Sequence, residues 1–416
     1  IIIMYHMIQT SAILFLSCIL FAACEKSDVD VGKLKDPIKI ELRGTETEIV
    51  QTDQQFAFDF FGRIYNEEPG ESFMVSPLSL SMALSMTWNG AAGETKTAMQ
   101  RALRMEQYGD DAEINGYYKK LKDALLITDP STKLSIANAI FTNQFVEIKP
   151  DFLNTNKQFY DAETKAVDFG NSATVGVVNQ WASDHTNGLI KEIIERTDPR
   201  DLMYLLNAIY FKGIWTTKFD KKNTSKKAFL TENGTKQTVD MMHQVSEFNY
   251  MEDETMQMVQ LPYGNEAFSM MVLLPQSGKK QVDVVEALQN KTYWGNAVER
   301  LRRSEVELYL PKFKTEYSKK LNDLLIDMGM GIAFSNQADF SGMSDYSAAI
   351  SLVQQNTYIS TDESGTEAAA VTIVGVGVTS VGPPEKVVFN ADRPFVYLIR
   401  ENSTGAILFM GSVATI

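Results

Sequence analysis

The side chains that could perform covalent or metal chemistry are few in this sequence. Its 416 residues include three histidines and two cysteines: His6, His185, His243, Cys18 and Cys24. A Ser-His-Asp triad needs an imidazole as general base, and a zinc site needs clustered histidine and cysteine ligands. The sequence has no such cluster and no G-x-S-x-G elbow, so it predicts neither triad hydrolysis nor a metal site.

Glycine-rich loops do not predict phosphate chemistry either. Gly90 and Gly93 lack the Gly-Lys-Ser/Thr ending of a phosphate-binding loop. The glycines of "GVGVTSVG" (375–382) have neither the spacing nor the following helix of a dinucleotide fingerprint. Acidic residues are plentiful, but no pair stands out as a general acid and base. We therefore expect that the chain is not an enzyme and that it needs no cofactor.

Composition and charge exclude a further class of function. The chain is 44% hydrophobic and 22% charged, as in ordinary globular proteins, and its formal net charge is −14. An acidic surface repels phosphates, so we expect no nucleic-acid partner. The one basic cluster consists of Lys218, Lys221, Lys222, Lys226 and Lys227. A solvated loop is its simplest interpretation, and a polyanion site is the alternative.

The first 24 residues are typical of a signal peptide. Residues 1–23 contain no Asp, Glu, Lys or Arg, and a short apolar run ends in small residues before Cys24. Phe21-Ala22-Ala23-Cys24 resembles the bacterial lipobox, whose cysteine is lipidated and becomes the mature N-terminus. This predicts export across the inner membrane and a lipid anchor in the cell envelope, periplasmic or on the outer-membrane surface. Plain secretion with cleavage near Ala23 is the alternative.

The elements that follow predict one domain of mixed structure. Residues 25–49 read as a polar tether, and no Pro/Gly/Ser-rich linker interrupts residues 50–416. Ser76 is placed to cap a helix, and Asn233-Gly234 between strand-like runs is a hairpin signal. Strands and helices are mixed without regular βα alternation, which predicts the α+β class.

One apolar stretch combines the signals of a strand and of a loop. Between Glu367 and Glu385 it carries no charge and consists largely of Ala, Val, Thr, Ile and Gly. It nevertheless ends in Gly382-Pro383-Pro384, as a loop does. Exposing so strand-prone a segment is an aggregation hazard, so its presence needs a reason.

Seven stretches in register resemble the serpin family. They are "SPLSLSMALSMTWNGAAGET" (76–95), "VNQWASDHTNGLIKEII" (178–194), "NAIYFKGIW" (207–215), "PKFKTEY" (311–317), "DESGTEAAAVT" (362–372), "FNADRPFVYLI" (389–399) and "AILFMGSVATI" (406–416). The resemblance implies a large five-stranded sheet, two smaller sheets, eight or nine helices and an exposed reactive loop near the C-terminus. It also implies suicide inhibition of serine proteases, in which the cleaved loop inserts into the large sheet.

The family pattern assigns roles within the apolar stretch. The hinge consists of Glu363, Gly365, Thr366, Glu367, Ala368, Ala369 and Ala370. Counting from Gly365 places the scissile bond between Thr379 and Ser380, with Val378 as neighbour. The segment has no basic or aromatic anchor, which favours elastase-like or subtilisin-like targets with a small apolar pocket. A valine before the scissile residue also suits papain-like cysteine proteases.

Other matching positions concern the movement of the sheet. Ser76, Ser79 and Asn207 match a polar cluster beneath the sheet, and Gln355 stands where the family often has histidine. Trp215 matches a tryptophan where the loop enters, and Lys312 matches a salt-bridge partner of Glu363. The implied partner is a protease held covalently by a monomeric inhibitor. A non-inhibitory serpin that acts as a binding or carrier protein is the alternative, although small hinge residues argue against it.

Overall fold

The structure is a computed structural model and describes residues 34–366 and 387–416. Its helices are α1 (Thr45–Glu67), α2 (Pro77–Trp88), α3 (Gly93–Ala102), α4 (Asp111–Leu125), α5 (Pro150–Tyr160), α6 (Ala173–His185), η2 (Lys221–Asn223), α7 (Gln281–Leu288), α8 (Tyr293–Glu299), α9 (Asn322–Leu325), η3 (Ile326–Met330) and η4 (Gly331–Phe334). Its strands are β1 (Phe73–Val75), β2 (Lys133–Asn143), β3 (Glu163–Val167), β4 (Met203–Ile214), β5 (Ser225–Leu230), β6 (Lys236–Glu252), β7 (Met256–Tyr263), β8 (Phe268–Pro275), β9 (Arg302–Pro311), β10 (Phe313–Lys320), β11 (Gln354–Asp362), β12 (Gly365–Thr366), β13 (Val387–Asn390), β14 (Phe395–Glu401) and β15 (Ile407–Val413). The mixture of helices and sheets in the described ranges confirms the predicted α+β class.

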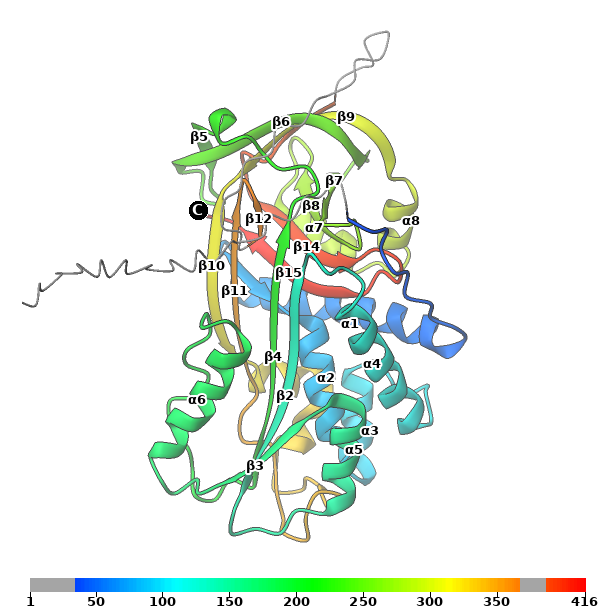
Figure 1. The fold of residues 1–416 in the computed structure, drawn as a ribbon, viewed down its shortest axis with the longest axis vertical. Coiled ribbons are helices and arrows are strands. Elements are labelled where there is room, and N and C mark those ends of the chain that lie inside the picture. The colour runs from blue at the N-terminus through cyan, green and yellow to red at the C-terminus, as the bar shows by residue number, and fades with distance from the viewer. Residues whose placement is uncertain (1–33, 367–386) are drawn as a thin grey trace, which may run out of the picture.

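A large sheet runs along the long axis of the molecule in the order β10-β11-β12-β4-β2-β3 (Figure 1). Five of these strands correspond to the large sheet expected from the sequence. The sixth, β12, adds only two residues between β11 and β4 and is antiparallel to both, so β4 and β11 run parallel. We call the end of the sheet that carries β12, at the top of Figure 1, the upper end.

The other nine strands form one continuous ladder rather than two separate small sheets. Its order is β1-β15-β14-β8-β7-β6-β9-β13, and β5 also pairs with β6. The connection is β6, whose 17 residues reach roughly 55 Å at about 3.3 Å per residue. Its earlier residues pair with β5 and β9, and its last four pair with β7. The two small sheets expected from the sequence are therefore joined through a single long strand.

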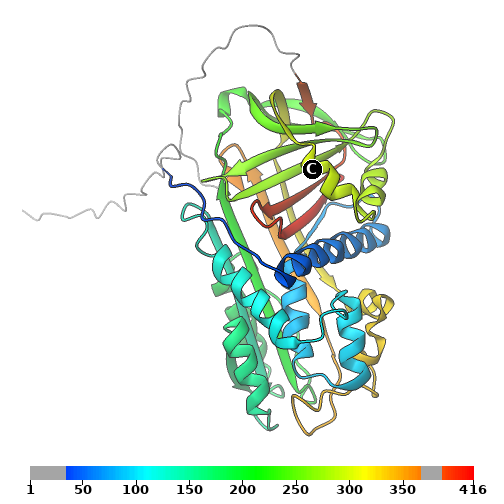
Figure 2. The same ribbon diagram turned by 90° about the vertical axis from the view of Figure 1, so that its right-hand side faces the viewer.

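Helices cover both faces of the large sheet (Figures 1 and 2). Successive residues of a strand point to opposite faces, and β4 obeys this period. Leu205 and Ile209 pack into the main core, to which α2 contributes, whereas Leu206 and Ala208 pack with Trp181 of α6. The strand is thus held between α2 on one face and α6 on the other.

The segment before α1 lies against the domain. Ile40 is buried, and its N–H donates to Ser403 Oγ at 2.9 Å. Thr128 Oγ1 donates to the carbonyl oxygen of Ile38 at 2.6 Å. Because α1 already begins at Thr45, the predicted boundary between tether and domain at residue 50 falls within this helix.

A partly buried carboxyl group joins α1 to α4. Asp53 accepts hydrogen bonds from the hydroxyls of Tyr117 and Tyr118, both at 2.9 Å. Burial raises the pKa of Asp53 to about 7, although the two hydroxyl donors act in the opposite direction. The ionised form is therefore disfavoured in the fold, and the protein loses stability as the pH rises from the ordinary value of 3.8 toward 7.

Replacing Asp53 with Asn should raise stability at neutral pH. An amide keeps a hydrogen-bond acceptor for the tyrosines and never ionises, so we expect a gain of about 1–3 kcal/mol at pH 8. The gain should shrink toward zero near pH 4, where the parent carboxyl is protonated. Thermal unfolding of both proteins from pH 4 to pH 8 measures this, and a pH-independent difference would contradict it.

Candidate functional site

The upper end of the large sheet holds a strand that has only begun to form. In β12, Gly365 pairs with Asp362 of β11 and with Ile214 of β4, while Thr366 pairs with Thr361 and Gly213. Below this pair, within the described chain, residues 203–212 of β4 and 354–360 of β11 have no partner on the edges that face each other. The two edges therefore leave unused ladder positions directly in line with β12.

Thr366 is fixed in this position by an aromatic pair. Only 2% of Thr366 is exposed, and its Oγ1 lies 2.5 Å from Tyr263 Oη. The Tyr263 ring stacks on Trp215 with 4.5 Å between centroids, and Trp215 Nε1 donates to the Asp362 carbonyl at 2.9 Å. Gly213 makes room for this stack, because a Cβ there would lie 2.7 Å from the Tyr263 ring.

Gly365 is required by a close approach of two backbones. A Cβ at this residue would lie 2.1 Å from the carbonyl oxygen of Gly213, and the glycine has φ +151°. Any side chain would therefore push β12 away from β4. The glycine allows the chain to turn from β11 into the space between the two strands.

A buried carboxylate lies just before β12. Glu363 Oε2 forms an ion pair with Lys312 Nζ at 3.0 Å, outside good hydrogen-bond geometry, while Oε1 accepts from Thr224 Oγ1 at 2.8 Å. The Glu363 carbonyl also accepts from the N–H of Phe219 at 3.0 Å. Burial alone would raise the pKa of Glu363, but backbone, Lys312 and Thr224 interactions together hold it below the usual 4.5. Its stabilising contribution is complete above 4.5 and is lost as the pH falls through the lower folded value.

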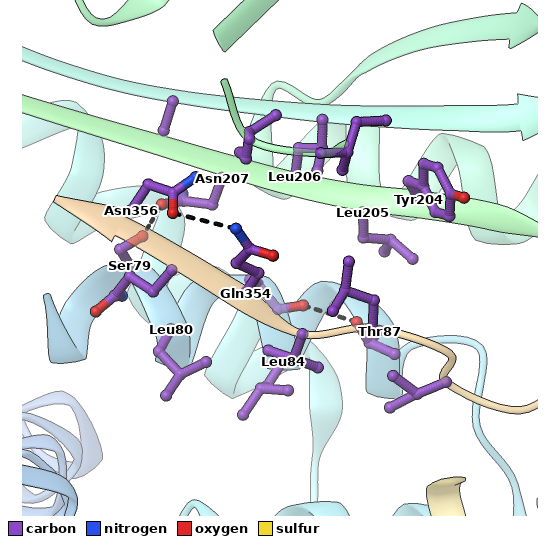
Figure 3. Close-up of a pocket in the computed structure, with 18 of the residues that line it drawn as sticks. Ser79, Leu80, Leu84, Thr87, Tyr204, Leu205, Leu206, Asn207, Gln354 and Asn356 are labelled. Carbon is purple, nitrogen blue, oxygen red and sulfur yellow. Dashed lines mark hydrogen bonds between the residues drawn. The ribbon is translucent and has the colours of Figure 1, made fainter. Parts of the chain in front are cut away.

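Between β4 and β11, below β12, lies an opening of about 130 Å³ (Figure 3). Leu80, Leu84 and Thr87 of α2 line it from one face, and Ile190 and Ile193 after α6 line it from the other. The opening is elongated along the two unpaired edges and mostly apolar. Its position and lining fit a further length of extended chain.

On the β11 side, Gln355 ties the opening to α2. Its Nε2 donates to the Ser76 carbonyl and its Oε1 accepts from the Ser76 N–H, both at 2.9 Å. Ser76 Oγ donates to the Leu408 carbonyl at 2.7 Å and caps α2 by accepting from the N–H of Ser79. The glutamine therefore uses both its donor and its acceptor on one backbone unit.

On the β4 side, Asn207 ties the opening to the same helix. Its Oδ1 accepts from Ser79 Oγ, as Figure 3 shows, and its Nδ2 donates to Asn138 Oδ1 at 2.7 Å. Asn138 in turn donates to the Tyr160 carbonyl at 2.7 Å. Each edge is thus hydrogen-bonded to α2, and among the described residues no hydrogen bond joins Gln355 to Asn207.

Comparisons with known proteins agree with this geometry. The family model described as "Serpin (serine protease inhibitor)" matches residues 51–416. The chain belongs to the serpin family. A serpin-like protein of Thermococcus kodakarensis is 36% identical over 88% of this chain and 86% of its own length. The leukocyte elastase inhibitor of Xenopus laevis is 34% identical over 86% and 96%.

A solved structure shares the fold of this serpin. Human thyroxine-binding globulin in complex with its ligand superposes with a TM-score of 0.81 and 29% identity, over 89% of this chain and 99% of that one. Family and fold are therefore those expected from the sequence.

Some predicted site residues of this serpin lie outside the described ranges. They are Cys24, Glu367, Ala368, Ala369, Ala370, Val378, Thr379 and Ser380. The predicted site residues within the described ranges lie in two groups. Glu363, Gly365, Thr366, Trp215 and Lys312 gather at the upper end, and Ser76, Ser79, Asn207 and Gln355 surround the opening. Within residues 34–366 and 387–416, no group of three His, Cys, Asp or Glu side chains is arranged to hold a metal ion, and no helix is long and apolar enough to span a membrane.

Three residues of the site were not predicted from the sequence. Tyr263 bonds to Thr366 across 103 positions, and Thr224 bonds to Glu363 across 139. Asn138 continues the hydrogen bonds of Asn207 into β2. Tyr263 carries no sequence signal for this role, and Thr224 lies within the lysine cluster, whose simplest interpretation was a solvated loop.

Replacing Glu363 with Lys should promote polymerisation. The new ammonium would face Lys312 in a buried site and lose the bond to Thr224, at a cost of about 3–5 kcal/mol. The loosened upper end would then accept a strand from a second molecule along the unpaired edges. Native gels after mild heating should show ladders for Glu363→Lys and far fewer for the matched variant Glu363→Gln. Equal monomer survival in the two variants would contradict the prediction.

Proposed function

We propose that this serpin is a suicide inhibitor of serine endopeptidases and that its loop inserts between β4 and β11 after cleavage. The observation that carries the proposal is β12, because Gly365 and Thr366 already pair with both strands. Both edges continue unpaired below it, and the opening between them lies directly in line with β12. The relative named leukocyte elastase inhibitor supports the same kind of target.

The proposed covalent step follows ordinary serine-protease chemistry. The serine Oγ of the protease bonds to the carbonyl carbon of Thr379, and the peptide bond to Ser380 breaks. The new amine of Ser380 leaves with the proton that the histidine of the protease took from its serine. The acyl-enzyme then remains attached to Thr379 while the chain before it inserts.

Insertion supplies the work that deforms the protease. In the inserted strand, period-two alternation places Ala368 and Ala370 on the same face as Thr366, and Glu367 on the other. Roughly a dozen new ladder hydrogen bonds at about 0.5–1.5 kcal/mol each give on the order of 10 kcal/mol. About 14 residues at ~3.3 Å each move the protease by roughly 45 Å. Ordinary proteins have a free energy of unfolding of about 5–15 kcal/mol, so a free energy of this size is sufficient to distort the protease.

The target should have a small apolar pocket. The proposed scissile residue, Thr379, has a short uncharged side chain, which suits elastase-like and subtilisin-like enzymes. Val378 adds papain-like cysteine proteases to the possible targets. Incubation with pancreatic or neutrophil elastase tests this. A covalent band of added mass on a denaturing gel is the expected result, and cleavage without an adduct would count against it.

Carriage of a small ligand is the second candidate, because the superposed thyroxine-binding globulin is a binding protein. A carrier does not need a loop that enters the sheet. Gly365 and Thr366 in β12, and the small residues that follow them, favour inhibition. Catalysis by the serpin itself forms no part of either function.

We also propose that Cys24 carries lipid and holds the monomeric inhibitor in the cell envelope. The lipobox-like sequence supports this. Membrane fractionation and mass spectrometry of the N-terminal peptide test it in the native host. The lipid should be lost and the protein should become soluble in Cys24→Ala, whereas an unmodified N-terminus in the parent would contradict the proposal.

A further inference from the structure

The lysine cluster occupies a defined place in the structure. We call residues 218–227 the lysine segment, which runs through η2 into β5. It contains five lysines and one acidic residue, Asp220, within a chain of net charge −14. Asp220 Oδ1 accepts from the backbone N–H of Lys222 at 3.0 Å and so shapes the turn. The segment is therefore positively charged in a protein that is negatively charged overall.

Two of the five lysines are engaged within the protein. Lys226 Nζ lies 2.9 Å from Asp240, and Lys227 Nζ lies 3.7 Å from the centroid of the Tyr309 ring. In the part of the chain that the structure describes, Lys218, Lys221 and Lys222 form no ion pair, and the last two are exposed. Among the described residues, these three positive charges have no acidic partner.

The lysine segment borders both described ends of the reactive loop. On one side, Phe219 and Thr224 hydrogen-bond to Glu363, three residues before Thr366. On the other side, the N–H of Leu230, at the end of β5, donates to the Asp392 carbonyl at 2.7 Å, just after β13. Figure 1 shows β5, β6 and β12 in the upper part of the molecule. Both points at which the described chain leads into residues 367–386 therefore lie near the lysine segment or the strand that continues it.

We propose that the lysine segment docks an acidic face of the protease that attacks the loop. This inference rests on the proposed inhibitory function and adds the charge of the partner to it. Most residues of the segment are exposed, so it fits a broad protein face rather than a small ion. Lysines on flexible stems act as point charges, which suits the polar rim of an interface.

The main effect of this contact should be on the association rate. Rim charges steer encounter and determine its salt dependence, and they add little to the strength of the final complex. The net charge of −14 repels an acidic protease from most directions, so a positive patch beside the loop also orients the approach. At 0.15 M ionic strength the Debye length is about 8 Å, so steering should weaken steeply as salt is added.

Charge reversal beside the loop tests the docking surface. The variant is Lys221→Glu with Lys222→Glu, which leaves the hinge bonds of Phe219 and Thr224 in place. The matched control is Lys157→Glu with Lys165→Glu, two exposed lysines on α5 and β3 in the lower part of Figure 1. Both variants change the net charge by the same amount. The probes are two forms of one subtilisin-like protease, with added carboxylates or added lysines around the same active-site cleft.

The measured quantity is the second-order rate of covalent complex formation between 0.02 and 0.5 M salt, roughly the range over which screening changes most. With the acidic protease at low salt, we expect about a tenfold slower rate for the loop-side variant than for the control. The difference should vanish at high salt and should reverse in sign with the basic protease.

Equal rates for the two variants at every salt concentration would overturn the docking surface while complex formation still supported inhibition. Absence of any complex, even for the parent serpin, would instead count against the proposed function. A dextran sulfate affinity that depends on Lys221 and Lys222, without an effect on the protease rate, would identify a polysaccharide site and would also overturn the proposal.

Discussion

An arginine in place of Thr366 should abolish the stable protease complex and leave cleavage of the loop intact. Thr366 is 2% exposed, between β11 and β4, with its hydroxyl against Tyr263. A guanidinium in that position would be buried without a carboxylate partner, which costs several kcal/mol. Insertion would not proceed past β12, and the acyl-enzyme would hydrolyse before the protease moved.

The substitution should change the fraction of acyl-enzyme that is trapped rather than hydrolysed. It should leave the rate at which the protease attacks the loop unchanged. We expect the fraction of protease trapped to fall by at least about a hundredfold, because each 1.4 kcal/mol changes a rate ratio tenfold. Denaturing gels and residual protease activity measure both products. The matched control is Thr366→Ser, which keeps the hydroxyl and the small volume and should trap normally. A trapping arginine variant would show that insertion does not pass through β12.

Cleavage of the loop should raise the thermal stability of the parent protein strongly. New pairing along residues 203–212 and 354–360 would fill the unused ladder positions and the opening between them. On the order of 10 kcal/mol gained, at roughly 2 °C per kcal/mol for a large domain, raises the midpoint by about 20 °C.

Calorimetry before and after limited proteolysis measures this difference, and Thr366→Arg serves as the control that is cut but cannot insert. An unchanged midpoint in the cleaved parent would instead favour a carrier role. A rise in both proteins would mean that cleavage stabilises the fold by a route other than insertion.

Local chemistry made much of the fold predictable from sequence. The predicted N-cap Ser76 accepts from the N–H of Ser79 at the start of α2. Asn233-Gly234 joins β5 to β6, and Gly234 has the positive φ of +81° that such a turn needs. These features depend on neighbours along the chain, so composition and spacing reveal them.

The coupling between distant strands was not predictable in the same way. Family resemblance pointed to Glu363 and Lys312, but the third partner, Thr224, lies in a stretch that reads as a solvated loop. Likewise, the resemblance placed Gln355 beside Ser76, Ser79 and Asn207, but it did not show that, among the described residues, the Gln355 side chain bonds only to the backbone of Ser76 and has no direct hydrogen bond to Asn207. Such arrangements depend on three-dimensional register, which single-sequence periodicity does not encode.

The arrangement of β12 has a kinetic consequence. Forming the first pairs of a new strand costs much conformational entropy and gains few hydrogen bonds. Later pairs form more easily, as in the nucleated growth of a helix. Here Gly365 and Thr366 are already paired on both sides. Growth of the strand is therefore propagation from an existing nucleus. In the proposed mechanism, insertion competes with hydrolysis of the acyl-enzyme. Because insertion needs no nucleation step, its rate should exceed that of a loop that has to form its first pairs after cleavage.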